Sequence, residues 1–206
     1  MIAAPQFLSP EEYLALEAQS DIRHEYLDGQ AYAMAGGTDA HTTIALNLAS
    51  ELRSHLRGTG CRVFMSDMKV QINQGPKFFY PDVMVTCDPG DRDRQLYKSA
   101  PCLIGEVLSN STEAFDRGRK FAAYRHLESL REYVLISAQQ PQVDIFRRSS
   151  AGQWVLESYE GIDAKLALET VNYQAGFDRL YEDVIFDQII PELLENQKVS
   201  VSLSGD

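Results

Sequence analysis

Two carboxylates and one lysine are the residues most able to do chemistry together. Asp82 precedes the apolar run Val-Met-Val-Thr, and Glu106 follows the apolar run Cys-Leu-Ile-Gly. Short apolar runs bounded by turn residues are typical of buried strands. Adjacent strands lie about 5 Å apart, so carboxylates at matching depths can share one cation. Lys120 lies on the helical pattern that follows, and the three side chains together would suit metal-assisted hydrolysis of a phosphodiester.

Each of these residues also has a purely structural interpretation. An Asp after a proline often forms a turn, and a Glu among apolar residues can be neutralised by an arginine. A lone Lys on a helix is usually solvated. Taken singly, the structural interpretations are the more frequent ones. The functional interpretation of Asp82 and Glu106 rests on their order along the chain and on a family resemblance.

The motifs around these residues resemble those of the PD-(D/E)xK nuclease superfamily, and more closely those of the Uma family of restriction-endonuclease-like proteins. A Pro-Asp pair alone is common, whereas EVLSxST followed by DxGxKxxxY and REYVLI is specific. The matching segments cover nearly the whole chain in order: LSPEEYLAL (8–16), HEYLDGQAYAMAGGTDAH (24–41), YPDVMV (80–85), APCLIGEVLSNST (100–112), DRGRKFAAY (116–124), LREYVLIS (130–137) and FDRLYEDVIF (177–186).

The chain departs from the superfamily pattern at one position. Leu108 stands two residues after Glu106, where the motif has its lysine. The resemblance implies that this lysine has moved to Lys120 on the following helix. It also implies that Glu25 belongs to the acidic set of the active site. The alternative for Glu25 is a surface strand residue that pairs with Arg23.

The same resemblance leads us to expect a Mg²⁺ or Mn²⁺ cofactor bound by Asp82, Glu106 and the Val107 carbonyl. Oxygen ligands suit these hard cations better than zinc, and the sequence has no His/Cys cluster that would argue otherwise. The cation would lower the pKa of a bound water and neutralise developing charge. Lys120 would position the nucleophile or stabilise that charge.

Composition predicts one globular domain. The chain has 206 residues, of which 44% are hydrophobic and 10% aromatic, as in ordinary single domains. We expect the domain to cover residues 1–196 and residues 197–206 to form a frayed tail. No apolar run approaches the roughly 18 residues of a membrane span, and the N-terminus does not resemble a secretory signal. A cytoplasmic location without a membrane partner is therefore expected.

The cysteine pattern agrees with that location. Cys61, Cys87 and Cys102 are too few and too scattered for a disulfide framework or a zinc site. Because all three lie in apolar stretches, we expect buried free thiols in a reducing compartment.

The net charge of −11 counts against a general nucleic-acid binder. Residues 91–148 are nevertheless the one part of the chain in which Lys and Arg outnumber Asp and Glu, by 10 to 8. Five of these basic residues could line a phosphate path, although solvated helix and loop faces are at least as frequent an explanation. They are Arg92, Arg94, Lys98, Arg117 and Arg119.

The order of the expected elements predicts an α/β fold in which a mixed β-sheet is flanked by helices, and the resemblance implies that this sheet is the core of a restriction-endonuclease-like domain. His41, in the first turn of a helix over 40–56, could touch phosphate, orient a carboxylate or make only a local hydrogen bond.

Gly118 weakens the helix that carries Lys120, so we expect a close approach of another part of the chain there. The other expected elements are a helix with a capping box at Ser9, a hairpin over 22–34 with an Asp-Gly turn, strands over 63–72, 132–137 and 142–147, and a last helix near 178–196.

We therefore predict a metal-dependent endonuclease that hydrolyses the phosphodiester bonds of nucleic acid, DNA more than RNA. One alternative is a non-catalytic module of the same fold that binds nucleic acid or a protein partner, which the acidic charge and Leu108 favour. Another is a small-molecule hydrolase that uses the same metal-binding carboxylate pair on a nucleotide. A homodimer is expected. Its interface would be an exposed β-edge or an apolar C-terminal helix with Val184, Ile185, Ile189, Ile190 and Leu193, although that helix could instead pack on its own sheet.

Overall fold

The computed structural model describes residues 7–34, 36–72 and 77–186. Its largest sheet has six strands in the order β11-β10-β9-β8-β6-β3 and is mixed, because only β8 and β9 run parallel. The strands are β3 (Arg62–Met65), β6 (Val83–Thr86), β8 (Pro101–Leu108), β9 (Glu132–Ser137), β10 (Gln142–Arg148) and β11 (Trp154–Glu160).

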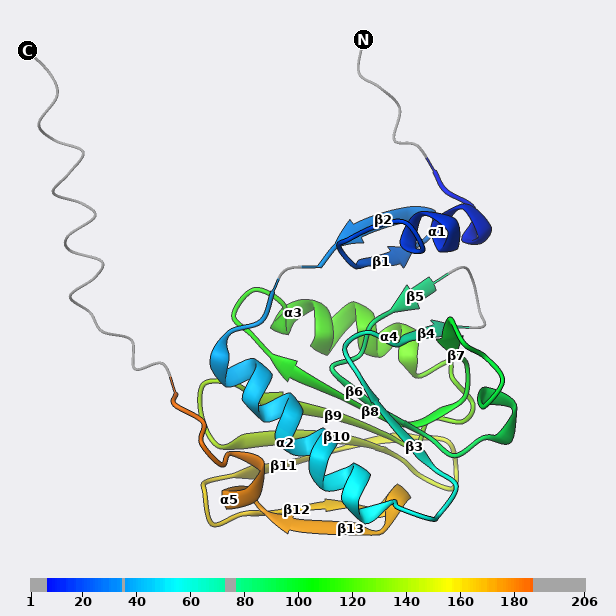
Figure 1. The fold of residues 1–206 in the computed structure, drawn as a ribbon. Coiled ribbons are helices and arrows are strands. Elements are labelled where there is room, and N and C mark those ends of the chain that lie inside the picture. Colours follow the sequence, from blue (N-terminus) through cyan, green and yellow to red (C-terminus); the bar gives the residue numbers. More distant parts are fainter. Residues whose placement is uncertain (1–6, 35, 73–76, 187–206) are drawn as a thin grey trace, which may run out of the picture.

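A second sheet of five strands lies above the first in Figure 1, with the order β2-β1-β5-β4-β7. Its strands are β1 (His24–Leu27), β2 (Gln30–Ala33), β4 (Lys69–Ile72), β5 (Lys77–Phe79) and β7 (Tyr97–Lys98). The β1–β2 hairpin confirms the predicted Asp-Gly turn. Asp28 and Gly29 have φ values of 49° and 91°, as the two central residues of a type I′ turn require.

The strand expected over 63–72 is wrong, because the chain leaves one sheet and enters the other within it. β3 ends at Met65, Ser66 turns the backbone with φ 46°, and β4 begins at Lys69 in the five-stranded sheet. The chain crosses back between β5 and β6. The Ser66 N–H lies 3.2 Å from the carbonyl oxygens of both Pro81 and Asp82. Asp82 therefore lies where the two crossings meet.

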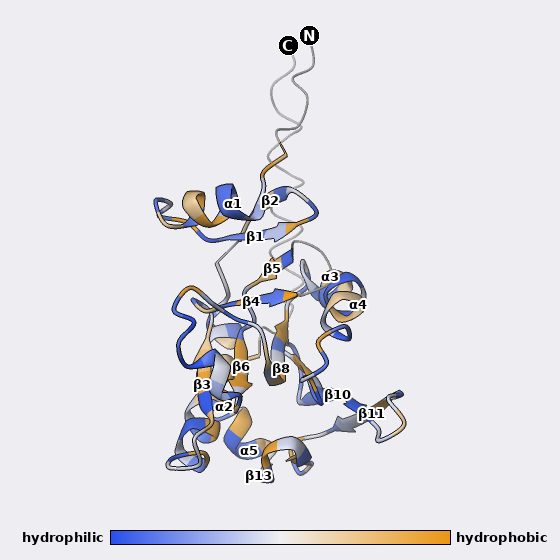
Figure 2. Cartoon of the chain, turned by 90° about the vertical axis from the view of Figure 1, so that its right-hand side faces the viewer, coloured by the Kyte–Doolittle hydropathy of each residue, from blue (hydrophilic) through white to orange (hydrophobic). Residues whose placement is uncertain are grey.

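Helices cover both faces of the six-stranded sheet (Figure 1). On one face lie α2 (Asp39–His55), α5 (Phe177–Leu180) and the hairpin β12 (Lys165–Leu168) and β13 (Tyr173–Gly176), whose apolar side chains pack against alternate residues of the strands. On the other face lie α4 (Phe121–Tyr124) and part of the five-stranded sheet. The central strands β6 and β8 are accordingly hydrophobic in Figure 2. The α1 helix (Pro10–Glu17) has the predicted capping box and packs Tyr13 on Tyr26 and Phe78.

The segment between β8 and β9 is helical but is not a regular α-helix. It runs through α3 (Glu113–Phe115), a π-helical turn over Asp116–Lys120 and α4 (Phe121–Tyr124). Such π-turns often lie at functional sites. The close approach expected at Gly118 is wrong, because a Cβ at that position would meet no atom within 4 Å.

The C-terminal part differs from the helix expected near 178–196. Helix α5 ends at Leu180 and turns follow it. Val184 packs on the core, whereas Ile185 is 80% exposed. Residues 187–206 lie outside the described ones, and with them the expected tail and the rest of that helix. Within the described residues, no helix is both long and apolar enough to cross a membrane.

The prediction of three buried free thiols is wrong. Cys61 and Cys87 form a disulfide, and Cys102 is a half-buried free cysteine. Cys61 precedes β3 and Cys87 follows β6, and in that antiparallel ladder Arg62 pairs with Thr86. The next position along the ladder brings the two cysteines opposite each other. Their pairing follows from strand register, which their spacing of 26 residues along the chain does not reveal.

Candidate active site

The register of β6 and β8 brings the two predicted carboxylates together. Val83 pairs with Gly105, so Asp82 and Glu106 are the next residues along the two antiparallel strands. The Asp82 N–H donates to Glu106 Oε2 at 3.3 Å, and the Val107 N–H donates to Asp82 Oδ2 at 2.7 Å. Asp82, Glu106 and Val107 line one cavity of about 410 Å³, the catalytic cavity.

Lys120 is buried at the centre of the site and is not a solvated helix residue. Its Nζ lies 2.9 Å from Glu25 Oε1, 3.2 Å from Glu106 Oε1 and 3.4 Å from Asp116 Oδ1. Glu25, on β1 of the five-stranded sheet, thus pairs with Lys120 on the helical segment after β8. The alternative partner of Glu25, Arg23, pairs with Asp67.

His41 orients one of the carboxylates. Its Nε2 lies 3.2 Å from Asp82 Oδ2, and its backbone N–H donates to the side chain of the helix-capping residue Thr38 at 3.3 Å. A Cβ at Gly37 would lie 2.7 Å from His41 Nδ1, so the glycine makes room for the ring. The hydrogen bond to Asp82 raises the pKa of His41 above its usual value, and burial opposes that shift.

Three further residues complete the site, and none of them was among the predicted site residues. Asp116 contacts Lys120, the Tyr124 hydroxyl donates to Glu106 Oε1 at 3.0 Å, and the Tyr80 N–H donates to Glu25 Oε1 at 3.4 Å. Asp116, Lys120 and Tyr124 are four residues apart along the chain. That spacing puts them on one helix face, and it was the signal by which Asp116 and Tyr124 could have been found.

The site carries more negative than positive charge. Glu25, Asp82, Glu106 and Asp116 surround a single lysine and one histidine. Desolvation by burial raises the pKa of Glu106 well above its usual value, and it also raises the pKa values of Asp116 and Glu25; in each case Lys120 opposes the shift. Burial disfavours the charged form of Lys120, but the surrounding carboxylates outweigh it and raise the Lys120 pKa. The lysine therefore stays charged.

A hard divalent cation fits this set of donors in part. Asp82 and Glu106 offer carboxylate oxygens at one end of the catalytic cavity, and Val107 also lines it. Within the described ranges, no three His, Cys, Asp or Glu side chains form a cluster that could hold a metal ion by themselves. Two carboxylates supplemented by a carbonyl and by water are what Mg²⁺ commonly accepts, because it keeps several waters. The excess of carboxylates over cationic side chains at the site would attract such a cation.

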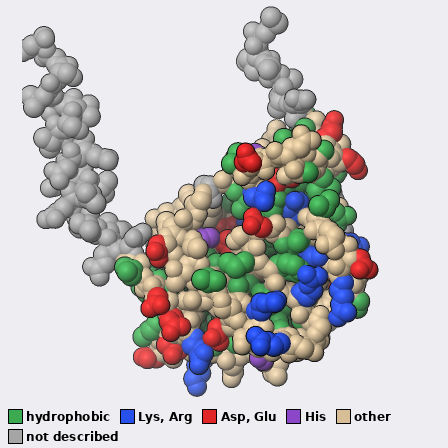
Figure 3. Space-filling view, viewed as in Figure 1, with side chains coloured by type: hydrophobic (Ala, Val, Ile, Leu, Met, Phe, Trp, Pro, Cys, Tyr) green, Lys and Arg blue, Asp and Glu red, His purple; other side chains and the backbone are tan. Residues whose placement is uncertain are grey.

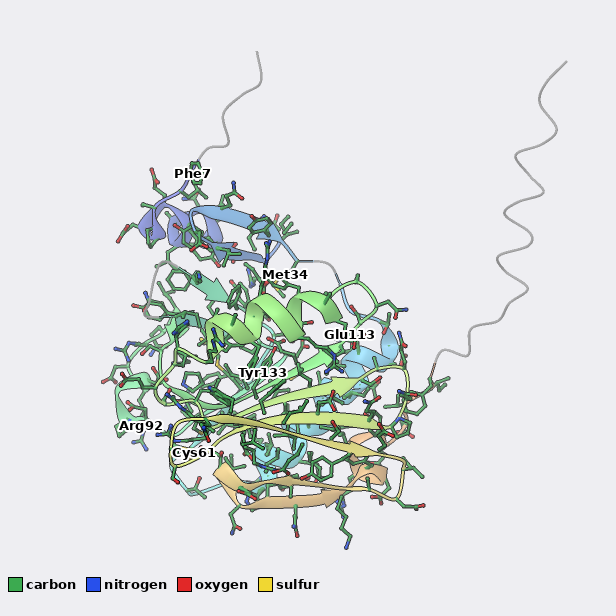
Figure 4. The ribbon with its side chains drawn as sticks, turned by 180° about the vertical axis from the view of Figure 1, so that it is seen from behind. Phe7, Met34, Cys61, Arg92, Glu113 and Tyr133 are labelled. Carbon is green, nitrogen blue, oxygen red and sulfur yellow. A yellow bond between two sulfur atoms is a disulfide. The ribbon has the colours of Figure 1, made fainter. Side chains whose placement is uncertain are left out.

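Most of the basic residues expected along a phosphate path have other roles. Lys98 is buried and donates to the Asp91 carbonyl at 2.7 Å, and Arg94 and Arg117 are paired with carboxylates. Arg92 lies beside Cys61, at the end of the molecule away from Met34, which lines the catalytic cavity (Figure 4). Only Arg119 of the five lines a cavity at the site. On the face shown in Figure 3, Lys and Arg gather on the side away from α5.

Comparisons with known proteins agree with this architecture. Two uncharacterized proteins of Synechocystis sp. are 41% and 33% identical to the chain; the alignments cover 87% and 81% of the chain and 94% and 95% of the relatives. A crystal structure from Anabaena variabilis, described as "a putative nuclease belonging to DUF820", matches with a TM-score of 0.69 at 16% identity, over 86% of this chain and 99% of that one. It confirms the predicted α/β fold with mixed β-sheets flanked by helices. The Uma2 family model, described as "Putative restriction endonuclease", matches residues 10–177. The chain therefore belongs to the Uma2 family.

Proposed function

We propose that this protein is a metal-dependent endonuclease that hydrolyses the phosphodiester bonds of nucleic acid, with DNA as the preferred substrate. The observation that carries the proposal is the convergence of four carboxylates and one buried lysine on the catalytic cavity. Unpaired negative charge in a cavity is costly unless a cation neutralises it. Membership of a family described as restriction endonucleases supports the same reaction.

Asp82, Glu106 and the Val107 carbonyl are the groups that would hold Mg²⁺ or Mn²⁺. When bound, the ion would supply a nucleophile from water and neutralise charge on the phosphate. The protein prepares this site in advance. His41 and the Val107 N–H fix Asp82, while Tyr124 and Lys120 fix Glu106, so neither carboxylate needs to reorganise during the reaction.

Lys120 acts as a positive charge and not as a general base, because its raised pKa keeps the ammonium protonated. The ammonium has three hydrogens and three carboxylate neighbours, Glu25, Glu106 and Asp116. A phosphate oxygen that reaches Lys120 would take the place of one of these carboxylates. Glu25 contributes by holding the ammonium toward the cavity from the opposite sheet.

Leu108 is compatible with catalysis. It is buried in the apolar cluster that contains Ile104, Leu135 and Tyr133, so an ammonium there would lose its solvation. Lys120 brings the charge to Glu106 from the helix instead. The non-catalytic alternative therefore gains support only from the acidic net charge.

Cleavage assays test the proposal. The purified protein is incubated with plasmid DNA, single-stranded DNA, RNA and a nucleoside triphosphate in Mg²⁺, in Mn²⁺ and in EDTA. We expect cleavage of nucleic acid only with a divalent ion, and a loss of at least about 100-fold in Asp82→Asn and Glu106→Gln. Asp67→Asn, at an exposed site, is the matched control. A folded wild-type protein that cleaves no nucleic acid would favour the binding module, and one that hydrolyses only the triphosphate would favour the nucleotide hydrolase.

A homodimer remains part of the proposal. Strand β11 forms an edge of the six-stranded sheet, and its Val155 and Leu156 are 49% and 50% exposed. An apolar sheet edge invites pairing with a second strand. Sedimentation equilibrium at micromolar concentration should detect the dimer, and a monomer throughout would count against it.

A further inference from the structure

A second cavity, of about 340 Å³, adjoins the catalytic one. It does not include His41, the α2 residue that lines the catalytic cavity. Among the described residues, three aromatic side chains and Leu27 line it together with two hydroxyl side chains, Arg119 and one carboxylate, Glu25. We call it the aromatic cavity. The two cavities share Glu25, Tyr32, Ser111, Thr112 and Phe115, and the aromatic cavity adds Leu27, Phe79 and Arg119.

Tyr32 is the exposed wall of the aromatic cavity. It pairs with Glu25 across the β1–β2 ladder, so both side chains project from the same face of the hairpin. Its hydroxyl donates to Gln30 Oε1 at 2.5 Å, which fixes the orientation of the ring. The side chain is nevertheless 49% exposed. Its ring is therefore held in place beside the active site with much of its surface open to a ligand.

Phe79 and Phe115 form the inner wall. Their rings meet edge to face with centroids 6.2 Å apart, and Phe79 packs in the same way on Tyr124 at 5.5 Å. Lys120 Nζ lies 6.0 Å from the Phe79 ring centroid. The aromatic wall thus packs on Tyr124, which holds Glu106, and a group in this cavity would contact the Phe79 ring that lies near Lys120.

Arg119 supplies a positive charge at the same place. It is exposed and lines the aromatic cavity, whereas its neighbours Arg117 and Lys120 are engaged by carboxylates. A guanidinium can contact a phosphate or stack on a planar ring. A flat ligand that carries negative charge alongside would satisfy both the aromatic walls and this arginine.

We propose that the aromatic cavity receives an unpaired nucleobase next to the phosphodiester that enters the catalytic cavity. This inference rests on the proposed function. Bases stack on aromatic side chains and on arginine, whereas a base inside a duplex is not accessible unless it leaves the stack. The substrate class is therefore single-stranded nucleic acid, or duplex nucleic acid with a base turned out at the cleavage site.

Binding in Ca²⁺, measured by fluorescence anisotropy and separately from cleavage in Mg²⁺, tests this inference. The probes are a labelled single-stranded oligodeoxynucleotide, the same strand with abasic residues in place of its nucleotides, and its blunt duplex. Wild-type protein should bind the base-containing single strand about tenfold more tightly than the other two, the factor that about 1.4 kcal/mol of stacking corresponds to. Tyr32→Ala and Arg119→Gln should lose this preference, and Tyr32→Phe should keep it. Leu96→Ala, at an exposed residue outside both cavities, is the matched control.

The outcomes separate this inference from the proposed function. If the protein binds the base-containing strand selectively but cleaves no nucleic acid, the aromatic cavity is still a nucleobase site and the nuclease activity is refuted. Metal-dependent cleavage with equal affinity for the three probes would refute the aromatic cavity alone. Affinity for the base-containing strand that survives Tyr32→Ala and Arg119→Gln, or no measurable binding of any probe, would also overturn the inference. Thermal melting of both variants verifies that they are folded, which the exposure of the two side chains leads us to expect.

Discussion

Two ion networks in this molecule differ in how fully their buried carboxylates are satisfied. Arg147 donates through Nε to Glu132 at 2.8 Å and also contacts Glu157. Glu132 accepts two further bonds, of 3.0 Å each, from the backbone N–H groups of Glu169 and Thr170. The guanidinium and the buried carboxylate therefore have several partners each, and the network joins β9, β10, β11 and the segment after β12.

The Lys120 network is built in the opposite way. One ammonium contacts three carboxylates, and a fourth, Asp82, lies in the same cavity. Burial raises the pKa values of Glu106, Asp116 and Glu25 despite the neighbouring ammonium. The Arg147 network joins strands of one sheet, whereas the Lys120 network is unbalanced and, under the proposed function, would receive a cation from outside.

Replacing the central cation of each network should distinguish the two most clearly. Arg147→Met leaves the buried Glu132 carboxylate without its ion-pair partner. It should therefore lower the free energy of unfolding by about 3–5 kcal/mol, with or without divalent ions. Lys120→Met should cost about 1–3 kcal/mol in EDTA. Mg²⁺ or Mn²⁺ should restore much of that loss, because the cation replaces the missing charge. Urea unfolding with and without divalent ions measures both. If divalent ions restored the stability of both variants, or of neither, the two networks would not differ in the way described.

The pH dependence of stability should reflect the unbalanced network. Between their unfolded pKa values, near 4, and their raised folded values, Glu25, Glu106 and Asp116 hold protons that the unfolded chain has released. His41, whose pKa is also raised, stabilises the fold below its unfolded pKa and loses that contribution as pH rises through its folded value. Both effects have the same sign.

The metal-free protein should therefore become less stable as pH rises above about 4 and through these folded pKa values. Urea unfolding in EDTA across that range measures the slope. Glu106→Gln should flatten it, because the amide does not titrate. A stability that rises with pH over the whole range in the wild type would contradict the assigned pKa directions.

The smallest effect is expected at the π-turn that carries Lys120. Gly118 is exposed in this turn, and a Cβ there would meet no neighbour. Gly118→Ala should therefore raise the free energy of unfolding by about 0.4–1 kcal/mol, because it reduces the freedom of the unfolded chain, and should leave activity unchanged. Thermal unfolding combined with the cleavage assay measures both. A destabilised or inactive variant would show that the π-turn needs glycine.

Sequence reasoning reached the parts of this site that depend on local spacing. The Asp-Gly turn and the Ser9 capping box follow from rules that operate within a few residues. The convergence of Asp82, Glu106 and Lys120 came from the order of motifs together with the family resemblance, and the structure brings these residues together. Their catalytic roles stay predictions.

What sequence reasoning missed depends on register and on changes of sheet. The apolar alternation over 63–72 shifts by one residue between Met65 and Met68, but this shift does not by itself show that the chain changes sheet there. The Cys61–Cys87 disulfide arises from the pairing of two strands that are distant in sequence. The contact of Glu25 with Lys120 joins the five-stranded sheet to the helical segment after β8, and only the assembled fold shows that the lysine is surrounded by carboxylates.

Isothermal titration of Mn²⁺ or Mg²⁺ into the metal-free protein tests the central claim most directly. We predict a binding site that Asp82→Asn removes, because the amide lacks the charge and half of the acceptor capacity of the carboxylate. The exposed Asp67→Asn control should bind like the wild type. A folded wild-type protein that binds no divalent ion, or an Asp82→Asn protein that binds it equally well, would contradict the account.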